Sequence, residues 1–599
     1  MNSAVFPKAN LWLWSGIIAV VTFGVYALSL GNGFVSLDDG MLITGNTFVQ
    51  HITPYNILRL FTSYDPELYV PLTLLTYQIE YAIAGASATL YHTTNLLLHI
   101  GNALLVLLAI HQIFKKPWLA IFCGLVFALH PINVDVVAWA SARKDVLSAF
   151  FGLLSLNSYI YYTQSPSEKN SKWLTVSITT FALGLLSKVV IVLLPFFYLI
   201  LDDHTGRKIS KETLKEKIPF GVLSILFLII AVIGRTKNTL LLTSFETMTM
   251  ACKSIVYSIK SIALPTGLSA IYPQLDSIEI SDLSFAIPIA LVLIGIGVFA
   301  WSYRKAPQVF LAGSFYGLLL APNIVNFSKG GFIFFADNRY SYLPSIGVIL
   351  IVGLGLHALC TTEKKTMGMG AAVGFLLLCF ATTSHIYART WKDSEALYRN
   401  VVAQYPTSSL SLNNYGAALN ARGAVDEALL LFERSAEIDP DFRAIANIGL
   451  IHQQRGEIDK AIEFYEQAIA SIDTLKQPQA GMYAPYYFLA GLRESMDQDE
   501  EAVALYEEAA ERGSIYAEPH LNLGIAYQKR LRLEDAEREL LLALDADPYL
   551  IPAHYHLSAV FAEQGKLTEA RNHLQSVVWM KPNYEQASKH LKNIKKMIR

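Results

Sequence analysis

Residues 11–30, LWLWSGIIAVVTFGVYALSL, run for 20 positions without a charged side chain. A helix of about 20 apolar residues spans the hydrocarbon core of a bilayer. No compact small-residue cleavage site follows this run, so it is interpreted as a retained span and not as a signal peptide. Further apolar runs lie near residues 93–114, 118–134, 146–163, 173–187, 189–201, 218–234, 285–301, 308–322, 344–360 and 367–384. The sequence therefore predicts an all-α, polytopic membrane bundle of about 11 spans.

The composition agrees with a membrane protein. Hydrophobic residues make up 53% of the chain, charged residues 16%, and the mean hydropathy is +0.37. Soluble domains carry about 25% charged residues, so the composition argues against a purely soluble enzyme. The net charge of −2 gives no general attraction to nucleic acid. The four cysteines form no CxxC spacing, which argues against a disulfide scaffold or a zinc site.

The amino-acid composition of the chain changes near residue 388, after which charged residues are frequent. Residues 1–388 are predicted to form the membrane domain, and residues 389–599 a second domain of about five repeats. One repeat contains Gly416, Gly423, Ala428, Phe432 and Pro440, and the first residues of successive repeats, at 416, 449, 490, 524 and 558, are 33, 41, 34 and 34 positions apart. This spacing is typical of tetratricopeptide repeats. We expect an α-solenoid whose concave face suits an extended polypeptide, with a spacer or dimerisation module as the alternative.

The orientation follows from the lysines and arginines of the short connectors. With the N-terminus inside, the inner connectors hold Lys115, Lys116, Lys169, Lys172, Arg207, Lys208, Lys211, Lys215, Lys217, Arg304, Lys305, Lys364 and Lys365. An odd number of spans then places the repeats outside the cytoplasm, on the same face as the loops at 31–92, 131–145, 235–284 and 323–343. Segment 252–265 carries two lysines and is interpreted as an interfacial helix; as a span it would reverse the side of the repeats.

The outer loops concentrate ionisable residues, which beside a membrane must be hydrated, paired or used. Asp38 and Asp39 closely follow the first span. A carboxylate pair there could do acid–base chemistry, although adjacent aspartates before a glycine also form ordinary turns and helix caps.

The second outer loop packs His130, Asp135, Arg143, Lys144 and Asp145 into 16 positions. The two adjacent cations could hold a lipid phosphate, or they could extend toward lipid headgroups as many Lys and Arg side chains at span ends do. His130 could equally be a structural histidine that caps a span.

The remaining candidates lie on the same expected face. Asp337, Arg339 and Tyr340 precede a span, Lys188 separates two short apolar runs, and Arg235 ends a span. Four outer loops thus offer carboxylates and cations together.

Several motifs resemble the multi-spanning GT-C glycosyltransferases, specifically the TMTC-like (transmembrane and tetratricopeptide-repeat-containing) relatives of the protein O-mannosyltransferases. They are Asp38-Asp39, Tyr69-Val70-Pro71, Asn95 to His99, His130 to Asp145, Ala336 to Pro344 and the appended repeats. The resemblance covers essentially the whole chain. Two positions depart from it, since the family often has Arg at Val70 and Lys-Glu at Lys188-Val189.

The resemblance implies a GT-C bundle that transfers one sugar, as in O-mannosylation, from a polyprenyl phosphate to a Ser or Thr hydroxyl of an exported protein. Asp38 or Asp39 would be the general base of an inverting attack, and cations would stabilise the leaving phosphate. The implied phosphate-binding residues are Arg143, Lys144, Arg339, Lys188 and Arg235, and the supporting residues are His130, Asp135, Asp145, Asp337 and Tyr340. No cofactor or metal is required or predicted, although an acidic loop could hold a divalent ion. The expected partners are the lipid-linked sugar donor, membrane lipid and an acceptor protein bound by the repeats.

Other functions compete with this prediction. A non-catalytic scaffold that recruits partners through its repeats would not need 11 spans, and a transporter would place its ionisable residues near the bilayer midplane. Transfer of whole glycans, or of sugars onto lipid, is a related alternative. The expected location is a bacterial inner membrane with the repeats in the periplasm, or alternatively the endoplasmic reticulum with the repeats in the lumen.

Overall fold

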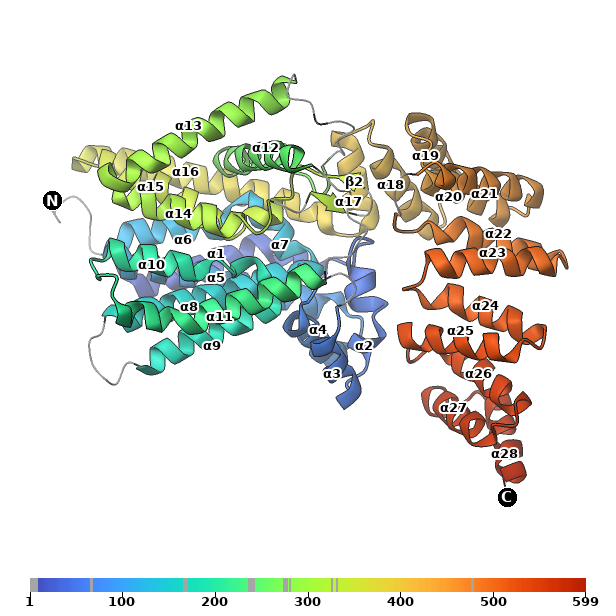
Figure 1. Ribbon diagram of the computed structural model, residues 1–599. Helices are drawn as coiled ribbons and strands as arrows, with labels where there is room; N and C mark the ends of the chain where they lie inside the picture. The colour runs from blue at the N-terminus through green and yellow to red at the C-terminus, as the bar shows by residue number, and fades with distance from the viewer. Residues whose placement is uncertain are drawn as a thin grey trace. The chain divides into compact units, whose positions relative to one another are not determined.

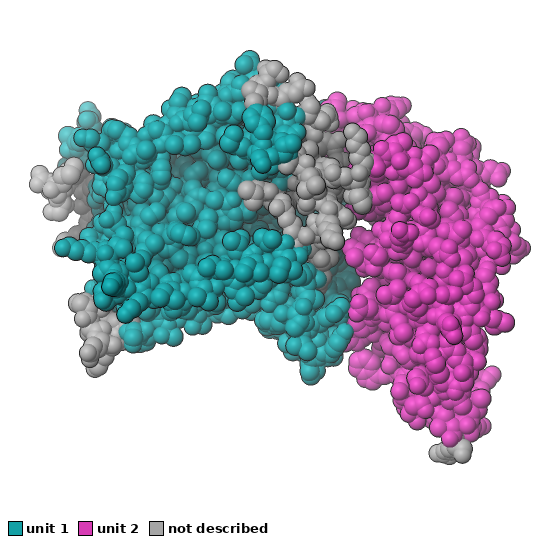
Figure 2. All heavy atoms as spheres, in the orientation of Figure 1, with its two compact units in different colours: residues 1–406 teal, residues 407–599 magenta. Residues whose placement is uncertain are grey.

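The computed structural model describes residues 9–64, 68–164, 171–234, 243–272, 278, 282–324, 327–329, 332–475 and 479–598. The chain divides into two compact units, residues 1–406 and 407–599, coloured separately in Figure 2. This division falls later than the change of composition near residue 388. The reason is that α17 (Ser394–Gln404) packs within unit 1, where the Tyr398 hydroxyl donates a hydrogen bond to the Ser36 carbonyl.

Unit 1 is helical, with short 3-10 and π turns between its helices (Figure 1). Besides α17, its helices are α1 (Leu11–Tyr26), α2 (Thr47–Gln50), α3 (Pro54–Thr62), α4 (Pro71–Ala84), α5 (Ala88–Phe114), α6 (Pro117–Leu129), α7 (Val134–Ala138), α8 (Arg143–Gln164), α9 (Ser171–Ser187), α10 (Leu194–His204), α11 (Lys211–Ile233), α12 (Ser244–Ala263), α13 (Leu283–Lys305), α14 (Pro307–Leu320), α15 (Ser345–Leu359) and α16 (Glu363–Ala388). In the described part of the chain, one antiparallel pair joins β1 (Ser328–Lys329) to β2 (Phe332–Ile333). The predicted all-α class is confirmed apart from this pair.

Local sequence explains where several helices begin. Proline occupies the first turn of α4, α6 and α14, where its missing N–H costs no intrahelical hydrogen bond. The Asn10 side chain accepts hydrogen bonds from the first turn of α1, and Thr362 caps α16 in the same way. Within the bundle, α5 packs against α1, α6 and α8.

The apolar runs all fall on helices, but the expected count of about 11 spans is not confirmed. Among the described residues, five helices are long and apolar enough to cross a membrane: Leu11–Gly31, Ala88–Phe114, Lys211–Ile233, Leu283–Lys305 and Glu363–Trp391. A sixth is reached if Pro117–Leu129 and Pro131–Ala138, bent by 51°, count as one broken span. The other runs form helices that are short, such as α10 with 11 residues, or that carry charges, such as α8. Segment 252–265 lies largely in α12 and is not among the five.

In the described residues of unit 2, five helix pairs are followed by a final helix. The helices are α18 (Ser409–Ala421), α19 (Val425–Ile438), α20 (Phe442–Gln454), α21 (Ile458–Asp473), α22 (Tyr483–Ser495), α23 (Asp499–Arg512), α24 (Ala517–Lys529), α25 (Leu533–Ala546), α26 (Ile551–Glu563), α27 (Leu567–Met580) and α28 (Glu585–Ile598). The small residues allow the close packing that the repeat pattern predicts. A Cβ atom at Gly416 would lie 2.7 Å from the Phe432 ring, and one at Gly524 would lie 2.7 Å from Leu540.

Candidate active site

Connectors from four parts of unit 1 converge at one end of its helices. The Lys144 ammonium lies 2.9 Å from Asp38 Oδ2, which joins the start of α8 to the loop after α1. The Lys188 ammonium lies 2.5 Å from Asp145 Oδ1, which adds the connector between α9 and α10. We call the residues Asp38, Lys144, Asp145, Lys188, Asp337 and Arg339 the ion-pair cluster. The convergence that the outer loops predicted is present for these residues.

Trp139 lies beneath two cations of the ion-pair cluster. The Arg339 guanidinium is 4.3 Å and the Lys144 ammonium 5.9 Å from the centroid of a Trp139 ring. The indole also stacks on the Trp391 ring, with a centroid distance of 5.3 Å. Trp139 therefore connects the loop before α15 to the start of α8 and anchors both to the end of α16.

Arg339 is paired through its guanidinium with Asp337, whose carboxylate accepts from Nε and from Nη2 at 3.0 and 2.5 Å. Burial disfavours the charge on Arg339, but the adjacent Asp337 carboxylate raises the pKa of the guanidinium above its ordinary value. The neighbouring Tyr340 ring lies 5.8 Å from the Lys188 ammonium. The third loop thus contributes a fixed cation beside two lysines.

The two aspartates after α1 have different surroundings. Asp39 is fully buried, and its carboxylate accepts hydrogen bonds from the Val35 N–H, the Ser141 N–H and the Ser141 hydroxyl. Burial raises the pKa of Asp39 to about 6, although these hydrogen bonds oppose the rise. The Asp38 side chain is 34% exposed. Of the pair, Asp38 is the carboxylate that an external hydroxyl can approach, whereas Asp39 holds the Ser141 turn against the first loop.

Lys188 and Asp145 form the most buried contact of the ion-pair cluster. Burial lowers the pKa of Lys188, the nearby Arg339 and Lys144 charges lower it further, and the Asp145 carboxylate opposes the shift. The second carboxylate oxygen of Asp145, Oδ2, is buried and accepts no hydrogen bond from the described residues. A buried acceptor without a donor is uncommon in folded proteins, so Oδ2 is suited to accept a hydrogen bond from a bound hydroxyl.

Arg143 requires a correction, because its guanidinium is used inside the protein. The side chain has no solvent exposure and donates to Asn95, Thr76, Glu80 and the Tyr91 carbonyl. The Glu80 carboxylate oxygens lie 3.0 Å from Arg143 Nη1 and 3.1 Å from Arg143 Nη2. These contacts use the five N–H donors of an arginine, so the geometry argues against Arg143 as a direct phosphate ligand. Its place is that of an internal anchor at the start of α8.

Two of the expected supporting residues also have structural surroundings. His130 accepts from the Ile132 N–H through Nδ1 and donates to the Ile262 carbonyl through Nε2, so its alternative interpretation as a structural histidine fits the geometry. Asp135 is buried and accepts hydrogen bonds from Asn338 and from the Trp391 indole. These contacts hold the loop before α15 and the end of α16 beside α7.

The structure gives little evidence on the two remaining predictions, which concern Arg235 and a metal ion. Arg235 lies outside the described residues. Within the described ranges no group of three or more His, Cys, Asp or Glu side chains could hold a metal ion. The need for a metal stays an expectation from the chemistry.

Sequence reasoning missed Glu80, Ser141 and Trp391 as parts of this region. Glu80 is the one acid of α4, a helix of otherwise uncharged residues, and a lone acid in such a helix indicates a buried partner. No comparable signal marks Ser141 or Trp391, because their contacts bring together residues more than 100 positions apart.

Comparisons with known proteins agree with the motifs. Two tetratricopeptide-repeat family models match residues 383–442 and 442–472. The chain is 23% identical to human protein O-mannosyl-transferase TMTC3 over 92% of this chain and 66% of the relative, and 23% identical to human protein O-mannosyl-transferase TMTC4 over 71% and 66%. It therefore spans just under two thirds of the length of these relatives.

Among solved structures, YrrB, described as a TPR protein with an unusual peptide-binding site, matches 33% of this chain and 97% of its own, with 16% identity and a TM-score of 0.27. The comparisons confirm the resemblance read from the motifs: over most of its length, this chain is similar to the TMTC protein O-mannosyl-transferases.

Proposed function

We propose that this protein is a membrane glycosyltransferase that moves one sugar, as in O-mannosylation, from a polyprenyl phosphate to a Ser or Thr hydroxyl of an exported protein. The proposal takes its reaction class from the names of the relatives and its chemistry from the ion-pair cluster. The single observation that carries it is the meeting of Asp38, Lys144, Lys188 and Arg339, from four separate connectors, at one end of the helices.

Asp38 is the proposed general base. The acceptor hydroxyl oxygen attacks the anomeric carbon, its proton passes to the Asp38 carboxylate, and the bond from that carbon to the phosphate oxygen breaks. In-line attack inverts the anomeric centre. The exposure of Asp38 favours it over Asp39, whose two oxygens are already held by Val35 and Ser141. Asp39 is then a positioning residue for the loop that carries Asp38.

The leaving polyprenyl phosphate gains negative charge as the bond breaks. Lys144, Lys188 and Arg339 are the proposed donors, because each is fixed by a carboxylate partner before substrate arrives. Fixed cations in a site that excludes water stabilise developing charge without reorganising. Asp145 Oδ2, which has no hydrogen-bond donor among the described residues, would accept a hydrogen bond from a hydroxyl of the sugar.

Unit 2 has a separate proposed role. Its repeats would hold the acceptor chain and raise the local concentration of the target hydroxyls. For this role, the repeats must lie on the same face of the membrane as the ion-pair cluster, which is the extracytoplasmic face in the proposed topology. That face belongs to a bacterial inner membrane, or alternatively to the endoplasmic reticulum.

Purification with polyprenyl-phosphate mannose and a candidate secreted acceptor, followed by mass analysis, tests the activity. The expected result is an added hexose on the acceptor, reduced by Asp38→Asn. A scaffold, which is the main rival, gives no hexose with any donor and leaves partner binding unchanged in Asp38→Asn. Deletion of residues 407–599 should lower transfer to the whole acceptor protein; unchanged transfer would contradict the role of the repeats.

A further inference from the structure

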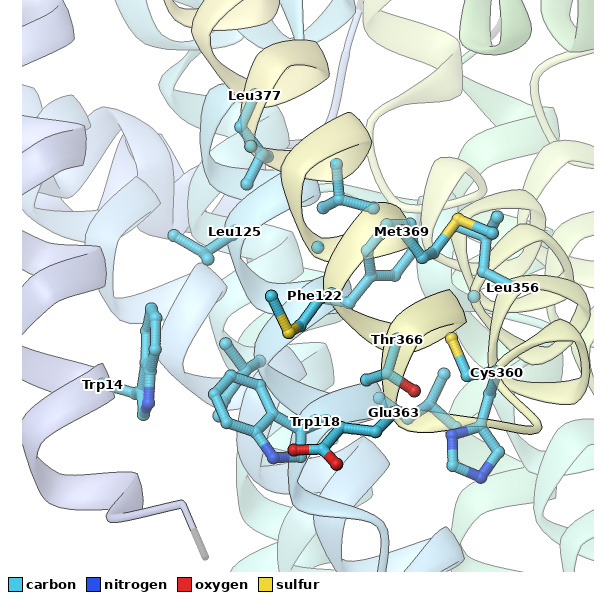
Figure 3. Close-up of a pocket in the computed structure, with 18 residues that line it drawn as sticks. Trp14, Trp118, Phe122, Leu125, Leu356, Cys360, Glu363, Thr366, Met369 and Leu377 are labelled. Carbon is cyan, nitrogen blue, oxygen red and sulfur yellow. The ribbon is translucent and has the colours of Figure 1, made fainter. Parts of the chain in front are cut away.

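Unit 1 contains a cavity whose lining includes no residue of the ion-pair cluster. It has a volume of about 660 Å³ and is lined by α1, α6, α15 and α16. Figure 3 shows Trp118, Glu363, Thr366 and Cys360 at one end of the cavity, with Leu125 and Leu377 toward the other. Cavities of 300–1,000 Å³ are the size that small ligands occupy.

The directions of the helices place this cavity at the opposite end of the bundle from the cluster. Its lining residues come from the N-terminal parts of α1, α6 and α16, as far as Leu125 and Leu377, and from the C-terminal part of α15. The cluster and its anchors follow the ends of α1, α6 and α16 and precede the start of α15. The sugar donor of the proposed function is therefore expected at the end of the bundle that carries the ion-pair cluster, and not in this cavity.

The walls are those of a site for hydrocarbon. They include Trp14, Phe122, Leu125, Val373 and Leu377. A Cβ atom at Gly370 or Gly374, both on α16, would meet no heavy atom within 4 Å, so the helix leaves open space there. Interiors are close-packed and lose dispersion contacts at a void, so a cavity of this size between apolar helices favours an apolar occupant.

Lysines lie next to the lining residues of the polar end in the sequence. Lys115 and Lys116 precede the first lining residue of α6, and Lys364 and Lys365 follow Glu363 on α16. The Lys115 ammonium donates to Gln164, so Lys116, Lys364 and Lys365 remain against the one glutamate, Glu363, and leave this end cationic. Basic pockets between membrane helices select lipids with anionic headgroups.

We propose that this cavity binds an anionic phospholipid, with one acyl chain between α6 and α16 and its phosphate near Lys116, Lys364 and Lys365. The occupant differs from the sugar donor in chemistry and in place. Its binding does not depend on glycosyl transfer, so the two proposals can fail separately.

Native mass spectrometry of the full chain tests this site. The protein is reconstituted in vesicles of equal phosphatidylglycerol and phosphatidylcholine and then extracted in mild detergent. The wild type should retain one phosphatidylglycerol per chain, in at least tenfold excess over phosphatidylcholine. Equal retention of the two lipids, or no retained lipid, would overturn the proposal.

Two sets of variants locate the lipid. Gly370→Leu with Gly374→Leu fills the cavity and should abolish retention, whereas Gly368→Leu, on the same helix but outside the lining, should not. Retention by the filled variant equal to that of Gly368→Leu would overturn the assignment to this cavity.

Lysine variants keep the test decisive if the filled variant does not fold. Replacing Lys116, Lys364 and Lys365 with Gln should remove the preference, so that the two lipids are retained about equally. Lys172→Gln, in another connector expected at the same face, is the matched control. An unchanged preference in the triple variant would contradict headgroup recognition.

Discussion

The two units differ in the burial of their ion pairs and in how far apart in sequence the paired residues lie. In unit 1 several ion pairs are buried and join residues far apart in sequence, as in Arg143 with Glu80, whose side chains are 0% and 7% exposed. The pairs of α17 and its start are exceptions, since Arg399 with Glu395 and Lys392 with Asp393 are exposed neighbours. In unit 2 most pairs are exposed and join neighbouring turns or adjacent helices, as in Arg455 with Asp426, which is 93% exposed. His520 with Glu539 is a buried exception. Removing a charge from water is costly without a partner, so the buried pairs, which are more numerous in the ion-pair cluster and around Arg143, constrain the fold, whereas the exposed pairs constrain little.

The largest expected effect of breaking a pair comes from the cluster of unit 1. Asp38→Asn keeps an oxygen that accepts from Lys144 but removes the base, so transfer should fall about 10²–10⁴-fold while the protein stays folded. Single-turnover transfer and thermal unfolding in detergent measure the two quantities. Asp426→Asn, in unit 2, is the control and should change neither. Full transfer by Asp38→Asn would exclude Asp38 as the base.

Breaking the Arg143 anchor should cost stability. Glu80→Ala leaves a buried guanidinium without its carboxylate and should lower the free energy of unfolding by about 3–5 kcal/mol. Glu537→Ala, which removes the partner of Lys566 in unit 2, should cost less than about 1 kcal/mol because that pair is partly exposed. Denaturant unfolding in detergent compares them. Similar losses in both variants would remove the contrast between the units.

Asp39 should make stability depend on pH. Burial raises the pKa of Asp39 to about 6, whereas in the unfolded chain it is near 4. Between about pH 4 and pH 6 the folded state binds more protons, so the free energy of unfolding should fall as the pH rises through this range. The expected contribution is at most about 3 kcal/mol.

Asp39→Asn, which cannot ionise, should lose this contribution. Unfolding at a series of pH values, with the wild type alongside, measures the difference. A variant with the same pH slope as the wild type would show that other groups cause it.

The smallest expected loss of stability concerns unit 2, whose helices are held together by close packing of small and large side chains and not by charge. Gly416→Val would place its side chain against Phe432 and should destabilise unit 2 by about 1–3 kcal/mol through overpacking. Gly368→Val, whose position on α16 meets open space, is the counterpart in unit 1 and should change stability little. Loss of helical signal on heating detects the difference.

The sequence predicted the positions of the helices better than it predicted which side chains contact one another. The apolar runs fell on helices and the repeat spacing predicted the helix pairs of unit 2, because both depend on local periodicity. The span count was not confirmed, since run length alone did not show that α10 would be only 11 residues long or that charges would begin α8. Of the candidate cations, Lys144, Lys188 and Arg339 lie together, whereas Arg143 is internal. Their role in binding a phosphate stays a prediction.

The sequence by itself determined that one part of the chain has the composition of a membrane domain and the other that of a water-soluble domain. It also determined that small residues permit paired helices and that acids and bases lie at the connectors of the bundle. Only the tertiary structure decided that Asp38 is open while Asp39 is buried, that Lys144 pairs with Asp38 and Lys188 with Asp145, and that a cavity remains beside Gly370. Periodicity fixes the face of a helix, whereas pairing depends on how connectors more than 40 positions apart meet, and no local pattern contains that information.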